Sequence, residues 1–374
     1  MHQFSINSEW SSRPADERFT SLTDLQAATN HRFEHSNARV VASRSLTADI
    51  EGSDLVIRGP SGAAAKPTHW AFGQLASRAG APAGYLRDLP KELVVDCLNH
   101  GLHVARPVED IGVLLYKNGG PAELHAVTGP NYGRIWDARV ADALVEAFGD
   151  GRTGAFRVPG EFGKQVAVTK DNTTLYASDR DMVVFLADED KSTEVPNRRD
   201  GKTGRISTGL AIGNSDVGGG KLWVACWAFD YICQNRIIWG MRDLEEFSIR
   251  HTASAPHRFL AEVVPMLKEI ARSNVTLKQA QIVAAQNAKV DDLDAFLKNR
   301  KFSRSQVAGI KAAYKSDEGI ELGLNSTSIW DAVVATTAYA RGLQYQDARI
   351  DIERVAGKML MSANAGAVST LRAA

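Results

Sequence analysis

The sequence has few cysteines, no long apolar run and no excess of either charge. Its 374 residues include three cysteines, too few for a disulfide framework, and this favours a reducing compartment. The 44 basic and 44 acidic residues give a formal net charge of zero, so a nucleic-acid site would have to be local. No apolar run approaches the roughly 20 residues that span a bilayer, and the N-terminus lacks the basic start and apolar core of a signal peptide. We therefore expect a soluble cytoplasmic protein without a membrane partner.

Hydrophobic patterning divides the chain near Arg250. Before that point, short runs of period two alternate irregularly with helical segments, which favours an α+β fold with a largely antiparallel sheet. After it, helical periodicity dominates. We expect an N-terminal arm with a short helix over residues 1–35, an α+β core over 36–255 and an all-helical C-terminal region over 256–374.

Individual elements follow from the same patterns. The expected strands before the central stretch include 39–42, 46–50, 55–58, 174–178 and a hairpin over 104–127. The expected core helices are 21–30, 70–79, 90–100 and one that begins at Asp137, whereas 60–67 reads as a Gly/Ala loop. The expected C-terminal helices are 256–273 with a kink or restart at Pro265, then 276–288, 290–298, 303–315 and 328–339, and the tail over 363–374 is expected to fray.

The longest nearly uncharged stretch runs from Ile206 to Met241. Residues 206–212 are typical of a strand, and residues 221–231 are apolar on both faces, as in a strand buried on both sides. Between them lies a turn that contains Gly213 and the Gly218–Gly220 run, and glycine adopts such a turn at least cost. The stretch therefore predicts a hairpin at the centre of the fold.

Two motifs invite assignments that their contexts do not support. His31 and His35 match the H-x-x-E-H pattern of inverted zincins, but the motif falls where a short helix gives way to a strand, so we expect no metal there. Gly201-Lys202-Thr203 resembles the end of a phosphate-binding loop, yet Pro196 stands where its first glycine belongs. The 213–218 run precedes a strand rather than the helix that would hold phosphate. We therefore expect no cofactor and no catalytic residue set.

Positive charge gathers on one side of the central hairpin, in the segment 198–205. A neutral chain that concentrates cations on one turn has a local surface that could follow phosphates. Nearby aromatic residues, among them Tyr132, Trp136 and Trp223, could stack on unpaired bases. The candidate nucleic-acid-binding residues are Arg198, Arg199, Lys202, Arg205, Lys221, Tyr132 and Arg134.

The chain resembles a phage/plasmid-like protein family of unknown function that occurs on bacterial mobile elements. The resemblance runs from about residue 10 to about residue 363, and its most specific part is Gly-Asn-Ser-Asp-Val-Gly-Gly-Gly over 213–220, followed by Ile-Cys-Gln-Asn over 232–235. Asp216 stands where the family has Glu, Gln234 where it has Thr, and Arg236 where it has Gly. Further likeness lies in Ala76…Ala81-Pro82…Tyr85-Leu86 and in the 132–137 segment. The resemblance implies a phage or plasmid gene acting in a bacterial cytoplasm.

The outline is also similar to that of Rad52-like single-strand annealing proteins, an analogy at the level of fold alone. We expect a protein that binds single-stranded DNA, anneals it, and forms a homo-oligomer. Two alternatives stay open. One is a metal-dependent enzyme acting on nucleotides or nucleic acid through Asn214 and Asp216. The other is an interaction or structural protein, such as an inhibitor of a host defence.

Overall fold

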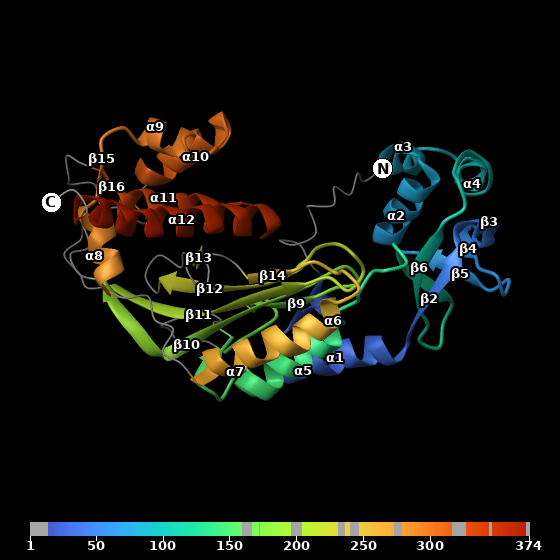
Figure 1. Ribbon diagram of the computed structural model, residues 1–374, viewed down its shortest axis with the longest axis horizontal. Coiled ribbons are helices and arrows are strands. Elements are labelled where there is room, and N and C mark those ends of the chain that lie inside the picture. The colour runs from blue at the N-terminus through green and yellow to red at the C-terminus, as the bar shows by residue number, and fades with distance from the viewer. Residues whose placement is uncertain are drawn as a thin grey trace.

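The computed structural model describes residues 14–158, 167–171, 173–195, 204–230, 236–239, 247–272, 279–315, 327–343 and 346–371. Within these residues the chain forms a smaller sheet, a larger sheet and a C-terminal group of helices (Figure 1). The predicted α+β class, with a largely antiparallel core, is confirmed. No helix of the described residues is long and apolar enough to cross a membrane.

The smaller sheet has six strands in the order β2-β6-β7-β5-β4-β3. The strands are β2 (Ser36–Ala42), β3 (Thr47–Glu51), β4 (Asp54–Arg58), β5 (Ala64–Pro67), β6 (Asp110–Tyr116) and β7 (Ala122–Thr128). Helices α2 (His69–Ala79), α3 (Ala83–Arg87) and α4 (Lys91–His100) pack their apolar side chains on this sheet. The loop expected over 60–67 is partly wrong, because residues 64–67 form β5. Among the described residues, β5 and β7 make the one parallel pair.

The larger sheet has its main path in the order β1-β9-β10-β11-β12-β13, with β8 pairing β10 and β14 pairing β12. Its strands are β1 (Arg18–Phe19), β8 (Phe156–Arg157), β9 (Leu175–Ala177), β10 (Met182–Val195), β11 (Gly204–Asn214), β12 (Leu222–Asp230), β13 (Arg236–Trp239) and β14 (Phe247–Ile249). β11 pairs antiparallel with β12, and Leu210 lies opposite Cys226. The predicted central hairpin is confirmed.

One face of the larger sheet is covered by helices from both ends of the core (Figure 1). These are α1 (Leu22–Glu34), α5 (Asp137–Phe148), α6 (Ala255–Arg258) and α7 (Val264–Arg272). Ser21 caps α1 as expected, since its Oγ accepts from the N–H of Asp24 at 3.0 Å. Residues 18–34 are joined to the larger sheet, because β1 pairs with β9 and α1 packs on α5.

The C-terminal helices cover the opposite face. They are α8 (Gln279–Asn287), α9 (Leu293–Lys298), α10 (Arg304–Lys315), α11 (Ile329–Arg341) and α12 (Gln346–Leu371). Ile350 of α12 packs against Val183, Phe185 and Ala211 of the sheet. The region is helical as predicted except for a two-residue ladder between β15 (Lys289–Val290) and β16 (Thr327–Ser328).

The helix expected over 256–273 is continuous over 255–272, with a π-helical turn just before its proline. α6 passes into a π-helical turn at Phe259–Val263, and α7 begins at Val264. Pro265 is then the second residue of α7, directly after the π-helical turn. Both α6 and α7 pack into the core of the larger sheet.

Candidate functional site

The glycine-rich turn between β11 and β12 is closed by its own serine. Ser215 Oγ donates to the carbonyl of Arg180 at 2.6 Å and accepts from the N–H of Gly219 at 2.7 Å. Gly218 has φ +89°, a left-handed conformation that glycine adopts without steric cost. The turn leads from one strand into the next, so its glycines shape a hairpin instead of a phosphate-binding loop before a helix.

The turn is bound to the smaller sheet through α2. Trp70 Nε1 and Gln74 Nε2 both donate to the carbonyl of Val217, at 3.2 and 2.8 Å. Gln74 Oε1 accepts from the N–H of Val127 in β7 at 2.8 Å. The Val217 side chain packs with Leu114 and other residues of the smaller sheet. The turn is therefore a joint between the two sheets, and Gln74 bridges them.

We expect Gln74→Ala to lower the free energy of unfolding by about 1–3 kcal/mol, because it leaves the buried N–H of Val127 without its side-chain partner and removes one of the two donors to the carbonyl of Val217. Urea unfolding followed by circular dichroism would measure the change. Ser77→Ala, at an exposed position on the same helix, should stay within about ±0.5 kcal/mol. Equal stability of the two variants would show that the bridge does not hold the joint.

Tyr132 and Arg134, both predicted site residues, also bind the turn. The Tyr132 hydroxyl donates to the carbonyl of Ser215 at 2.9 Å, and Arg134 Nη1 donates to that of Asp216. Burial raises the pKa of Tyr132, which keeps its hydroxyl a donor at neutral pH. The Arg134 guanidinium lies 5.3 Å from the Tyr132 ring centroid. Their polar groups support the joint, and Tyr132 also lines a pocket described below.

Two carboxylates meet beneath the turn. Asp216 Oδ2 accepts from the Asp137 N–H at 3.4 Å, and Asn214 Nδ2 donates to Asp137 Oδ1 at 2.7 Å and to the carbonyl of Ile135 at 2.8 Å. Burial, followed by the charge of Asp216, raises the pKa of Asp137 well above its ordinary value. The two residues of the enzyme alternative, Asn214 and Asp216, are thus buried and occupied in fixing the start of α5.

Metal ligands do not gather in the described part of the chain. No three His, Cys, Asp or Glu side chains there are arranged to hold a metal ion. In the H-x-x-E-H motif, α1 ends at Glu34, and His35 is its C-cap. The rings of His31 and His35 lie 4.2 Å apart, centroid to centroid, and His35 Nδ1 is 2.8 Å from the carbonyl of His31.

His251 lies beside the joint and stacks on Tyr132, with ring centroids 4.8 Å apart and planes 14° from parallel. Its Nδ1 is 3.1 Å from the carbonyl of Gly133, and its Nε2 is buried and meets no hydrogen-bond partner among the described residues. Burial lowers the pKa of His251 to about 4. The ring is therefore neutral at pH 7.

This titration predicts that stability falls on acidification. In the unfolded chain His251 would titrate at its ordinary value of 6.5, against about 4 when folded, so only the unfolded chain binds the proton between these values. The free energy of unfolding that depends on the neutral His251 ring is fully present above pH 6.5 and decreases as the pH falls toward 4. We expect His251→Gln to flatten the pH dependence of the urea midpoint in this window, and His257→Gln, at an exposed position, to leave it unchanged. An unaltered pH profile in His251→Gln would contradict the assignment.

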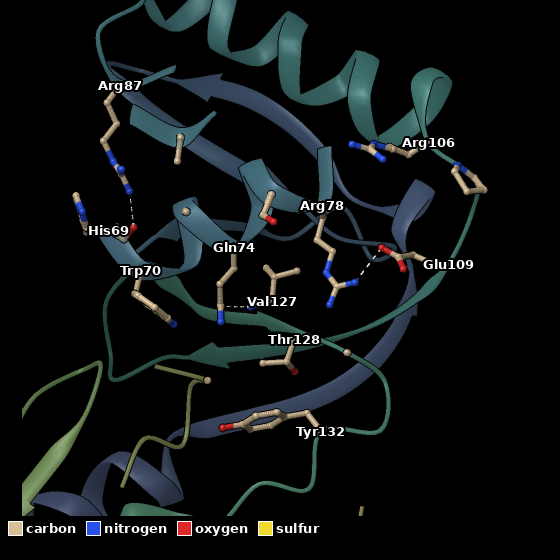
Figure 2. A pocket seen from close by; sticks show the side chains of 16 residues that line it. His69, Trp70, Gln74, Arg78, Arg87, Arg106, Glu109, Val127, Thr128 and Tyr132 are labelled. Atoms are coloured by element: carbon tan, nitrogen blue, oxygen red, sulfur yellow. Dashed lines mark hydrogen bonds and ion pairs between the residues drawn. The ribbon is translucent and has the colours of Figure 1, made fainter. Parts of the chain in front are cut away.

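A pocket of about 720 Å³ opens along the polar side of α2, and we call it the α2 pocket. Gly73 and Ser77 are its small helix residues, and Trp70 and Tyr132 contribute aromatic walls. Figure 2 shows Arg87 beside His69 at one end of the pocket, and Arg78 with Glu109 near Arg106 at the other. Guanidinium side chains therefore lie at both ends of the α2 pocket.

The three arginines of the α2 pocket differ in how they are held. Arg78 Nη1 pairs with Glu109 Oε1 at 3.1 Å, and Arg87 Nη2 donates to the carbonyl of His69 at 3.0 Å. Arg106 packs against Gly80, where a Cβ would lie 2.4 Å from its Nη2. In the described part of the chain, the Arg106 guanidinium has no hydrogen bond or ion pair. Burial lowers the pKa of His69, so His69 adds little charge at neutral pH.

A second pocket of about 440 Å³ lies on the other side of the glycine-rich turn, between the larger sheet and α12, and we call it the α12 pocket. Arg180 connects the two pockets. It lines the α12 pocket, and its guanidinium lies 5.3 Å from the ring centroid of Trp70, which lines the α2 pocket. The cations that line the two pockets are Arg78, Arg87, Arg106, Arg180, Lys221 and Arg354, and the carboxylates are Glu109, Asp181 and Asp351. Positive charge is thus in local excess on a chain that is neutral as a whole.

Only residues 204 and 205 of the predicted basic segment 198–205 belong to the described part of the chain. Arg198, Arg199 and Lys202 lie outside the described residues. Arg205 lies in β11 opposite Glu194 of β10. Lys221 is exposed, lines the α12 pocket, and its Nζ is 3.0 Å from Ser248 Oγ. Of the predicted cations, the structure therefore places Lys221 at a pocket.

The arginines of the α2 pocket were not predicted from the sequence. The segment 70–79 was recognised as a helix from its apolar face, while the opposite side carries Gly73, Ser77 and Arg78. The signal that the sequence contains is the polar side of this helix, where Gly73 and Ser77 lie between Trp70 and Arg78. Arg87 and Arg106 come from separate segments, and no linear motif joins them.

Comparison of the chain with family models, curated proteins and solved structures found no match. The resemblance to the phage/plasmid-like family stays a prediction, and the functional argument depends on the residues of the two pockets.

Proposed function

We propose that this protein binds single-stranded DNA over the α2 pocket and the glycine-rich turn. The observation that carries the proposal is the local excess of guanidinium groups around two adjoining pockets of a neutral chain. Arg106 is the strongest element, because its guanidinium is exposed beside Gly80 and has no protein partner within the described residues. Guanidinium groups bind phosphate through paired, charge-assisted hydrogen bonds.

The shape of the α2 pocket favours a single strand over a duplex. A pocket of this size can take in one nucleotide, and only an unpaired strand can turn a base out of its stack at low cost. Trp70 presents a half-buried indole to this space, and a base could stack there. Gly73 lets a ligand approach the helix backbone, since the nearest atom to a Cβ at Gly73 would be Arg87 Nη2 at 3.6 Å.

Salt-dependent binding tests the proposal. The affinity for a labelled oligothymidylate, measured by fluorescence anisotropy at several salt concentrations, should fall linearly on logarithmic axes. Loss of one phosphate contact in Arg106→Ala should reduce the slope by about 0.7. If the basic segment 198–205 also contacts the DNA, Arg199→Ala with Lys202→Ala should reduce the slope by about 1.4.

Arg139→Ala is the matched control for this assay. Arg139 is exposed on α5 and pairs with Asp142 at 3.0 Å, on the helical face of the larger sheet, so its loss should leave the slope unchanged. A wild-type protein that does not bind the oligonucleotide at low salt would contradict the proposed function. A slope for Arg106→Ala equal to that of the wild type would remove the α2 pocket from it. Equal affinity for a mononucleotide would favour the nucleotide-processing alternative.

A further inference from the structure

The two edges of the smaller sheet are finished differently. At the β3 edge, a side-chain amide occupies the outward backbone groups: Asn99 Oδ1 accepts from the N–H of Ala48 at 2.8 Å, and Asn99 Nδ2 donates to its carbonyl at 2.9 Å. His103 Nε2 lies 2.7 Å from the carbonyl of Leu46, which precedes the same strand. The helical segment over 91–105 therefore closes this edge against further strands.

The β2 edge has no such closure. Within the described residues β2 pairs with β6 alone, over seven residues without a shift of register. Residues 37–40 are exposed whichever face they point to, so no other described element covers this strand. Its sequence contains no proline, lysine or bulge, and Arg39 is its one charged residue among the devices that usually protect an edge strand from pairing. The unpaired edge can therefore accept another strand.

One face of β2 is apolar. Side chains alternate between the two faces of a strand. One face of β2 therefore carries Ser36, Ala38, Val40 and Ala42. The other face carries Asn37, Arg39 and Val41. Val40 is 57% exposed. Its cross-strand neighbour in β6 is Gly112, which has no side chain to cover it. The exposure of Val40 thus follows from the pairing of the sheet.

We propose that β2 is the contact between two copies of this chain, which pair antiparallel about Val40 and join their smaller sheets into one. A two-fold axis at Val40 places Ala38 opposite Ala42 of the second copy and Val40 opposite itself, which buries an unbroken apolar strip. Arg39 then lies opposite Val41. An axis at Arg39 would instead set two arginines opposite each other, which is destabilising. Repulsion between like charges therefore disfavours the register centred on Arg39.

A second copy fits this edge because the strand is self-complementary in that register. An antiparallel pair of identical strands is an isologous contact, which closes at two chains and leaves no open edge at β2. The capped β3 edge cannot serve as the partner, so a head-to-tail filament of smaller sheets is excluded by Asn99. The expected assembly is a dimer with a continuous twelve-stranded sheet, twice the six strands of one copy.

Sedimentation equilibrium of the full chain tests the proposal. We expect concentration-dependent dimerisation of the wild type, and self-association at least about tenfold weaker in Val40→Lys, which sets like charges directly opposite each other. Thr47→Lys is the matched control, because Thr47 is an exposed residue of the capped edge strand. Circular dichroism would establish that both variants are folded. A wild type that is monomeric at every concentration, or a dimer that Val40→Lys leaves intact, would overturn the proposal.

Disulfide trapping tests the register. In a Cys97→Ser background, which removes the exposed thiol, Val40→Cys should form a covalent dimer under mild oxidation, because residues directly opposite have Cβ atoms about 4.5–5.5 Å apart. Arg39→Cys should cross-link poorly, because two such residues would be diagonal neighbours about 7–8 Å apart. Faster trapping through Arg39→Cys would overturn the register centred on Val40.

Discussion

Reversing two charges of the α2 pocket, with Arg87→Glu and Arg106→Glu, is expected to weaken binding of single-stranded DNA by two orders of magnitude or more. A hydrogen bond to a charged group contributes about 1.5–3 kcal/mol, and about 1.4 kcal/mol corresponds to tenfold in affinity. Two lost phosphate contacts therefore account for the expected change, and the new carboxylates repel the strand as well. Fluorescence anisotropy at fixed low salt would measure it.

The control makes the same change of net charge elsewhere. Arg139→Glu with Lys268→Glu alters an exposed and a half-buried side chain on the helical face of the larger sheet, which form ion pairs with Asp142 and Glu146. This variant should bind nearly as well as the wild type. An equal loss of affinity in both variants would mean that overall charge, rather than the pocket, governs binding.

Gly133→Ala is expected to destabilise the fold by several kcal/mol, a large part of the roughly 5–15 kcal/mol that stabilises a typical domain. A Cβ at this position would lie 1.8 Å from the carbonyl oxygen of Thr252 and 2.7 Å from its carbon. Both are backbone atoms, so no side-chain rotation relieves the overlap. The Gly133 N–H also donates to the carbonyl of His251 at 3.1 Å. Urea unfolding would measure the loss.

Gly84→Ala is the comparison for this substitution. A Cβ at Gly84 meets no atom within 4 Å, and Gly84 lies in α3, where alanine is favoured over glycine by up to about 1 kcal/mol. That variant should match or exceed the stability of the wild type. If Gly133→Ala unfolds at the same urea concentration as Gly84→Ala, the close approach of residues 133 and 252 does not form in solution.

The fold class could be predicted because periodicity is local. Alternation over β2 to β4 and helical spacing in α2, α5 and α10 record which side chains are buried, and both survive in a single sequence. The partner of a strand is not recorded in this way, so the separation into two sheets was missed. β5 shows the limit: residues 64–67 are Ala-Ala-Lys-Pro, which has no strand pattern, and they form a strand between β4 and β7.

The candidate site was harder to predict than the fold. Arg78, Arg87 and Arg106 belong to three segments, and only the packing of α2, α3 and the chain before β6 brings them to one pocket. The glycine-rich turn was recognised from composition, and its hairpin form is confirmed. Its contact with α2 depends on carbonyl groups, which carry no signature in the sequence. Charge clustering along the chain instead drew attention to residues 198–205, most of which lie outside the description.

The way in which the joint is held bears on how its sequence can change during evolution. Trp70, Gln74, Tyr132 and Arg134 all donate to main-chain carbonyls of residues 215–217. A carbonyl accepts in the same way whatever side chain its residue carries, so substitutions at the three acceptors leave these bonds intact, whereas substitutions at the four donors do not. Selection on these four hydrogen bonds therefore acts on the donors, whereas Ser215 and Val217 are constrained by the other contacts of their own side chains. Co-variation between the two sheets should be weak at this joint, even though it is where they are connected.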